Sequence, residues 1–136
     1  MDAGGIAARR QQLLEGLTGT VIEVGAGNGL NLAYYPAGVT RVLAVEPDPF
    51  LRRIAYGNAA SAPVPVEVTD GVAEELPAGD GAFDAAVATF VLCSVASQQA
   101  VLREIRRVLR PGGQLRFLSM SAPRLPAGGA RSACST

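Results

Sequence analysis

The sequence lacks histidine and tryptophan altogether, and aromatic residues make up only 5% of its 136 positions. Without histidine the chain has neither the commonest general base nor a favoured ligand for transition metals. Any chemistry must therefore proceed without an imidazole, and we expect no metal site. Because aromatic rings are so few, the core must be built mainly from valine, leucine, isoleucine and alanine.

Neither sign of charge is in excess, because twelve basic residues balance twelve acidic ones. A surface that binds nucleic acid usually needs a basic excess, so no nucleic-acid partner is expected. One segment does concentrate arginines, and we interpret it as the solvated face of a helix. Its members are Arg103, Arg106, Arg107 and Arg110.

Long apolar runs are also missing. No stretch of about 18 apolar residues is present to span a membrane, and the N-terminus lacks the charged start and apolar stretch of a signal peptide. The two cysteines, Cys93 and Cys134, lie in different contexts and suggest no disulfide framework. We therefore expect a cytoplasmic protein, with Cys93 as a small buried residue.

What the sequence contains is an alternation of short apolar runs and helical patterns. Apolar residues at helical spacing predict helices over Ala7–Leu17, from Asp48-Pro49 onward, and from Ser97 to the turn Pro111-Gly112-Gly113. Five runs that are apolar almost throughout predict buried strands. They are Thr20–Val24, Arg41–Glu46, Val64–Val68, Phe83–Ala88 and Gln114–Leu118.

This alternation predicts an α/β fold, in which right-handed crossovers link parallel strands and helices cover both faces of the sheet. Residues 1–118 are assigned to one domain. Residues 119–136 contain mainly Ala, Gly, Pro, Ser and Arg without a pattern, and we expect them to form a flexible tail.

Candidate chemistry is concentrated where the first two predicted strands end. The first strand leads into Glu23-Val24-Gly25-Ala26-Gly27-Asn28-Gly29, where glycines permit a tight turn and let a ligand approach the backbone. Glu46 ends the second strand, and in a parallel sheet these two ends are neighbours at the ligand-binding crevice. A carboxylate there can accept hydrogen bonds from both hydroxyls of a ribose. A purely structural turn and a surface glutamate are the alternatives.

The turn also narrows the choice of nucleoside. Leu30 stands where a dinucleotide fingerprint needs glycine, and the turn has no lysine of the kind found in a phosphate loop. Glu23 places a carboxylate beside the turn, which disfavours a pyrophosphate. It favours a ligand with an ammonium group, such as the methionyl part of S-adenosylmethionine (SAM).

The pattern Glu-x-Gly-x-Gly-x-Gly, followed by an acid after the second strand, resembles the first two motifs of class I SAM-dependent methyltransferases. Segments 72–77, 83–87 and 102–113 resemble later motifs of that family in the same order. The chain is identified as a member, of the methyltransferase domain 11 type. The resemblance implies a Rossmann-like fold with strand order 3-2-1-4-5, SAM as cofactor, and in-line methyl transfer to a small-molecule acceptor.

The resemblance also implies where SAM would bind. The methionyl part would lie on the glycine turn, the ribose and adenine by the end of the second strand and the loop after the third, and the methyl group by the end of the fourth. The residues, in that order, are Glu23, Gly25, Ala26, Gly27, Gly29 and Asn31; Glu46, Pro47, Val72 and Ala73; Thr89 and Phe90. Val72 is a departure, because many relatives place an aspartate there for the adenine amino group.

Segments 29–36 and 89–95 are similar to methyltransferase-like proteins that methylate small thiols, and to their bacterial relatives. The chain is more distantly similar to the methyltransferases of quinone biosynthesis. A thiol acceptor also fits the missing histidine, because a thiol ionises easily. No residue is assigned as catalytic, because proximity and orientation supply most of the rate. A SAM-binding module without activity and a nicotinamide-nucleotide-binding domain are the alternatives.

Relatives in this family continue past the fifth strand into further strands that carry much of the substrate pocket. Nothing of that kind follows Leu118, so we expect a C-terminally truncated product. Gln114–Leu118 would then be an exposed edge strand. Such edges template pairing with other chains, which predicts self-association, for example as a homodimer.

Overall fold

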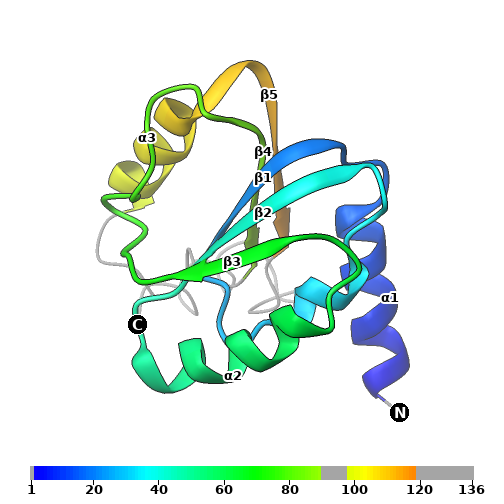
Figure 1. Ribbon diagram of the computed structural model, residues 1–136. Helices are drawn as coiled ribbons and strands as arrows, with labels where there is room; N and C mark the ends of the chain where they lie inside the picture. Colours follow the sequence, from blue (N-terminus) through cyan, green and yellow to red (C-terminus); the bar gives the residue numbers. More distant parts are fainter. Residues whose placement is uncertain (1, 90–97, 119–136) are drawn as a thin grey trace, which may run out of the picture.

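The computed structural model describes residues 2–89 and 98–118, and Figure 1 shows a central sheet with helices around it. Five parallel strands form the sheet in the order β3-β2-β1-β4-β5, which confirms the predicted order. Their bounds are β1 Gly19–Val24, β2 Val39–Val45, β3 Val66–Thr69, β4 Phe83–Thr89 and β5 Leu109–Leu118. The expected tail, residues 119–136, lies outside the described residues.

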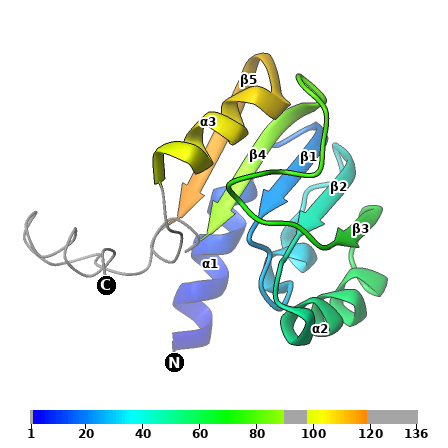
Figure 2. The ribbon, with the colours of Figure 1, turned by 90° about the vertical axis from the view of Figure 1, so that its left-hand side faces the viewer.

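Helices cover both faces of the sheet, as predicted (Figure 2). One face carries α1 (Asp2–Leu14), the short 3-10 helix η1 (Leu30–Tyr34) and α2 (Pro49–Ala60); the other carries α3 (Gln98–Val108). Neighbouring residues of a strand point to opposite faces. In β1, Val21 therefore joins the core beneath α1 and α2, whereas Ile22 joins the core beneath α3.

Local chemistry explains how α2 begins. The Asp48 carboxylate accepts hydrogen bonds from the backbone amides of Phe50 and Leu51, at 2.8 and 3.3 Å, and Pro49 occupies the first turn. An N-cap acid satisfies amides that have no partner within the helix, and proline needs no partner there. The predicted start of this helix is confirmed.

Several boundaries differ from the predictions. Helix α1 ends at Leu14 rather than Leu17, although Leu17 still packs in the core from the following turn. Strand β3 begins at Val66 rather than Val64, because Pro65 has no amide hydrogen to donate. Pro111-Gly112-Gly113 lies within β5 and does not end α3, which stops at Val108.

The start of β1 depends on a glycine beside a charged side chain. Gly19 has a φ of +79°, and a Cβ at this position would collide with the carboxylate of Asp84 in β4. That carboxylate accepts from the Thr20 amide at 2.8 Å and also pairs with Arg110. The Thr20 amide and Arg110 together hold the pKa of Asp84 below its usual value. The contact therefore joins β1, β4 and β5.

We predict that Gly19→Ala lowers the free energy of unfolding by about 1–3 kcal/mol, because the new methyl group must displace Asp84 and strain a left-handed backbone. Gly57→Ala, in the exposed middle of α2 with open space around its Cα, is the control and should raise stability by about 0.5–1 kcal/mol. Urea denaturation measures both. Equal stability of the Gly19→Ala variant and the wild type would contradict the contact.

Candidate cofactor site

The glycine turn lies where β1 ends, and neighbouring elements hold it in place. Gly25, Gly27 and Gly29 have φ values of 72°, 62° and 85°. Residues with a side chain rarely adopt this backbone conformation. The amides of Gly25 and Ala26 both donate to the carbonyl oxygen of Val45 in β2, each at 2.9 Å. The turn is therefore fixed to the end of β2.

Gly29 and Gly27 need to be glycine for different structural reasons. A Cβ on Gly29 would lie 3.0 Å from the Cα of Ala55, so Gly29 permits α2 to pack against the turn. A Cβ on Gly27 would meet nothing within 4 Å. Space beside the Gly27 backbone is what the close approach of a ligand requires.

The structure brings Glu46 to this turn. Its carboxylate accepts from the Gly27 amide at 2.7 Å through one oxygen and from the Asp48 amide at 3.0 Å through the other. The residue is only 6% exposed. Each carboxylate oxygen can accept a second hydrogen bond. Glu46 therefore has acceptor capacity left for two hydroxyl groups while it holds the turn.

Glu23 lies near the end of β1 and is buried. Its two oxygens accept from the Tyr35 hydroxyl at 2.8 Å and from the Asn31 side-chain amide at 2.9 Å. Arg10 of α1 donates to the Asn31 side-chain oxygen at 2.6 Å. Burial raises the pKa of Glu23 to about 7, while the two hydrogen bonds and the Arg10 charge lower it.

Sequence reasoning placed Asn31 near the site but missed Arg10 and Tyr35. Tyr35 is buried, and burial together with the Glu23 charge raises the pKa of its hydroxyl well above the usual value. No motif covers Arg10, and Tyr35 lies in segment 29–36, whose resemblance to small-thiol methyltransferases gave it no role. Both residues reach Glu23 only through the packing of α1 and η1 on β1.

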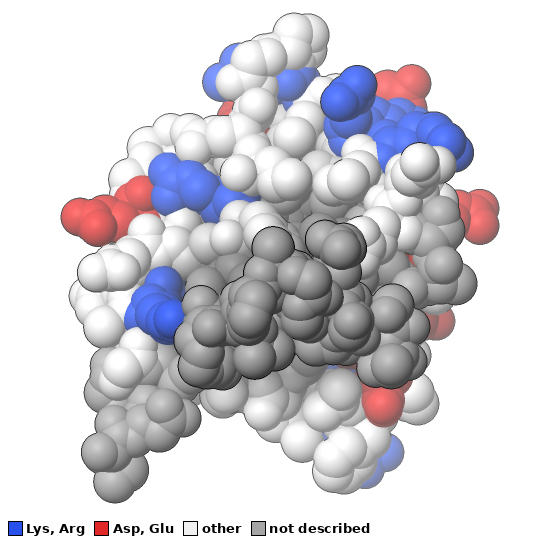
Figure 3. All heavy atoms as spheres, turned by 180° about the vertical axis from the view of Figure 1, so that it is seen from behind, with Lys and Arg blue, Asp and Glu red and all other residues white. Residues whose placement is uncertain are grey.

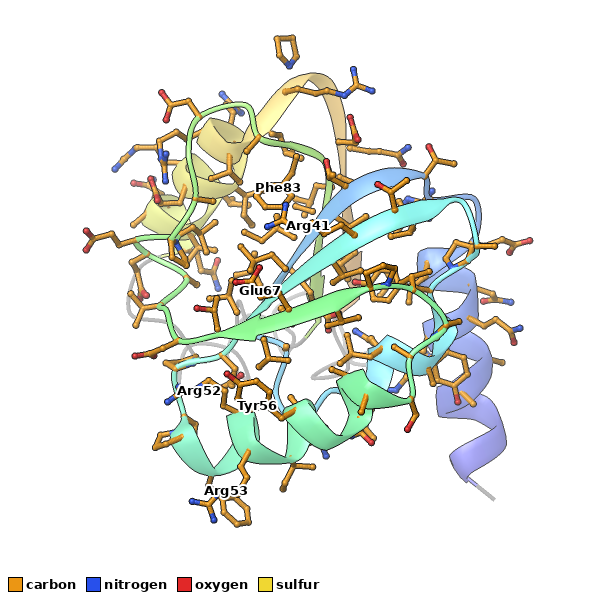
Figure 4. The ribbon with its side chains drawn as sticks, viewed as in Figure 1. Arg41, Arg52, Arg53, Tyr56, Glu67 and Phe83 are labelled. Atoms are coloured by element: carbon orange, nitrogen blue, oxygen red, sulfur yellow. The ribbon has the colours of Figure 1, made fainter. Side chains whose placement is uncertain are left out.

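The expected adenine side is built from the ends of β2 and β3. Arg52 lies on α2 (Figure 4). It donates to the backbone oxygens of Glu46 and Pro47, at 2.8 and 3.1 Å, and pairs with Asp70 at 3.2 Å. Sequence reasoning missed these contacts of Arg52. In the loop that follows, Val72 is 44% exposed and Ala73 is buried.

Helix α3 anchors that loop from the other face. Glu104 accepts from the Leu76 amide at 2.8 Å, and Arg107 pairs with both Glu104 and Asp80. The interpretation of this segment's arginines as a solvated helix face is thus wrong for Arg107, which is tied into the loop, and for Arg110, which lies in β5 and pairs with Asp84. Figure 3 shows basic side chains beside acidic ones, with no continuous basic surface over the described residues in that view.

The expected methyl side is only partly described. The backbone of Thr89 ends β4 and pairs with Leu118 of β5. The Thr89 side chain, Phe90 and Cys93 lie outside the described residues. Within residues 2–89 and 98–118, no group of three metal-binding side chains comes together, and no helix is long and apolar enough to cross a membrane.

Comparison with known proteins decides the family. The sequence profile of a family described as "Methyltransferase domain" matches residues 22–117, which include the whole glycine turn, Glu46 and α3. The chain belongs to this methyltransferase family. The identification drawn from the sequence motifs is confirmed, and with it the Rossmann-like α/β fold.

Individual relatives agree with this assignment. Thiol S-methyltransferase TMT1B of Homo sapiens is 39% identical over 112 residues, which are 76% of this chain and 46% of the relative. Demethylmenaquinone methyltransferase of Mycobacterium tuberculosis is 49% identical over 65 residues, which are 48% of this chain and 28% of the relative. This methyltransferase chain therefore spans less than half the length of the curated relatives it matches here.

Among solved structures, the chain is similar to a SAM-dependent methyltransferase of Thermotoga maritima, described as a possible histamine N-methyltransferase. The TM-score is 0.66 and the identity 29%, over 81% of this chain and 49% of that one. The predicted fold of the methyltransferase family is thus found in the three-dimensional structure as well as in the motifs.

We predict that Glu46→Ala weakens SAM binding by about 1.5–3 kcal/mol, the range for hydrogen bonds to a charged group. Glu46→Gln should lose less, because its amide oxygen can still accept from Gly27. Glu67→Ala, an exposed acid on β3, is the control and should bind like the wild type. Calorimetry measures all three, and unchanged affinity of Glu46→Ala would remove this residue from the site.

We predict that Gly27→Val abolishes SAM binding while leaving much of the fold, because its side chain would enter the space beside the turn. Gly29→Val should instead disrupt the fold, since its side chain would meet the backbone of α2. Circular dichroism and SAM titration distinguish the two effects. Normal SAM binding by the Gly27→Val variant would show that the ligand does not approach the turn there.

Proposed function

We propose that this protein binds SAM where β1 and β2 end and transfers its methyl group to a small-molecule acceptor. The observation that carries the proposal is the hydrogen bond between the Gly27 amide and Glu46. It places a ribose acceptor beside a turn whose backbone is open to a ligand. Nine further residues are proposed to complete the cofactor site: Gly25, Ala26, Gly29, Asn31, Pro47, Val72, Ala73, Thr89 and Phe90.

The mechanism that this site supports needs little chemistry from the protein. Bound SAM would supply an activated methyl group, as a sulfonium. The glycine turn would position the methionyl part, and Glu46 would accept hydrogen bonds from the ribose hydroxyls. Glu23, a carboxylate beneath the turn, would favour the ammonium group. Orientation of the acceptor then supplies most of the rate.

The acceptor we propose is a small thiol. A relative that is 39% identical is named a thiol S-methyltransferase, and the chain contains no histidine to act as a base. A free thiol has a pKa near 8.5, so a useful fraction is already thiolate at neutral pH. The thiolate is the nucleophile, and it can react without a protein base.

Titration and turnover test the proposal in two steps. Calorimetry should show binding of SAM and none of NAD, since Leu30 and Glu23 do not suit a dinucleotide. Methyl transfer from labelled SAM to a panel of small thiols and quinols should then favour thiols. Binding of NAD in place of SAM would overturn the proposal. Binding of SAM without turnover would identify a SAM-binding module, the alternative to an active enzyme.

We also propose that residues 1–118 act as one cytoplasmic domain that self-associates through β5. No strand within the described residues pairs with the outer edge of β5, and Leu115 and Phe117 on it are 38% and 44% exposed. An open edge with apolar side chains favours pairing with another copy.

Light scattering should therefore detect a dimer or larger species at micromolar concentration. Phe117→Arg should reduce the associated fraction, because it places a charge at the edge. Phe50→Arg, on the exposed surface of α2, is the control and should leave association unchanged. A stable wild-type monomer, or equal effects of both variants, would defeat this proposal.

A further inference from the structure

A buried polar cluster joins three elements beneath the glycine turn. We define the Glu23 cluster as Glu23 of β1, Asn31 and Tyr35 of η1 and its C-terminal cap, and Arg10 of α1. The hydrogen bonds run from Arg10 to Asn31, from Asn31 to Glu23, and from Tyr35 to Glu23. Arg10 and Glu23 are 13 positions apart, so only the packing of α1 on η1 brings them together.

The Glu23 cluster compensates the free-energy cost of burying a charged carboxylate. A carboxylate without solvent is strongly disfavoured in its charged form unless charge and hydrogen bonds compensate. The Tyr35 hydroxyl and the Asn31 amide each donate to one oxygen, and Arg10 supplies the positive charge behind Asn31. Chains of hydrogen bonds of this kind polarise one another in a low dielectric. Each of the three outer members lowers the pKa of Glu23, so removing any one of them should raise it.

We propose that Tyr35 and Arg10 are positioning residues of the cofactor site, which hold Glu23 ionised and oriented for the ammonium group of the bound cofactor. The inference rests on the proposed function, and it adds two residues and one element to the site. Helix α1 then contributes to cofactor affinity without touching the cofactor, because Arg10 acts through Asn31.

The sign of the pH dependence follows from this arrangement. Protonated Glu23 carries no charge to attract an ammonium group, so affinity for such a ligand should rise with pH as Glu23 ionises near pH 7. The charged and titratable groups that face Glu23 are Arg10 from α1 and Tyr35 from the end of η1. Loss of either raises the pKa of Glu23, with Tyr35 the larger influence. The rise in affinity then moves to higher pH.

The experiment measures the dissociation constants of two probes between about pH 5.5 and 8, a range that brackets the titration of Glu23. S-adenosylhomocysteine carries the ammonium group, whereas 5′-methylthioadenosine has the same nucleoside and a thioether but no amino-acid part. The variants are Tyr35→Phe and Arg10→Met. Their controls are Tyr34→Phe, on the neighbouring tyrosine of η1, and Arg53→Met, on the exposed arginine of α2 (Figure 4).

We expect wild-type affinity for S-adenosylhomocysteine to rise through pH 7 and affinity for methylthioadenosine to stay level. Tyr35→Phe should weaken binding of the first probe about tenfold at pH 6, and Arg10→Met should weaken it less. Both controls should follow the wild type. In a Glu23→Gln background the affinity for S-adenosylhomocysteine should no longer depend on pH in this range. Adding Tyr35→Phe to that background should then leave the affinity unchanged at every pH. This comparison separates positioning from a general loss of stability.

Two results would overturn the inference while leaving the proposed function intact. One is an equal pH dependence for both probes, and the other is a Tyr35→Phe profile that superimposes on the wild type. Failure of the folded wild type to bind either probe at any pH would instead defeat the proposed function, and this inference with it.

Discussion

The hydrogen bond from the Gly27 amide to Glu46, at 2.7 Å, is the contact on which the site depends. It closes the turn after β1 onto the end of β2, beside the two amides that donate to Val45. The same glutamate accepts from the Asp48 amide, next to the start of α2. One buried carboxylate thus fixes the glycine turn, the strand end and the entry to a helix relative to one another.

The two acids of the site lie in different environments and are suited to different tasks. Glu46 accepts hydrogen bonds from two backbone amides at the end of β2, which compensate its charge. Glu23 lies in the core, where burial raises its pKa to about 7 and side chains oppose that rise. A buried carboxylate with adjustable charge suits a cationic group better than a neutral one.

The second face of the sheet supports the same site from a distance. Glu104 of α3 accepts from the Leu76 amide, and Arg107 holds Glu104 in place. These contacts fix the loop after β3, which carries Val72 and Ala73. Since α3 also buries Val101 and Ile105 against the sheet, packing and loop position are coupled.

The sequence alone was enough for the parallel α/β fold, the glycine turn and the nearness of Glu46 to it, and the family resemblance added the strand order. The first three features are local or topological, because apolar runs alternate with helices and parallel strands present their C-terminal ends at one edge. Tertiary structure alone decided where Glu23 points and which residues surround it. Arg10, Asn31 and Tyr35 meet it only because α1 and η1 pack on the face of β1 that carries Val21 and Glu23. Likewise, Arg107 has the sequence pattern of a solvated arginine, and only the fold of the loop near Asp80 gives it partners. Contacts between distant segments depend on packing, which no periodicity in the chain records.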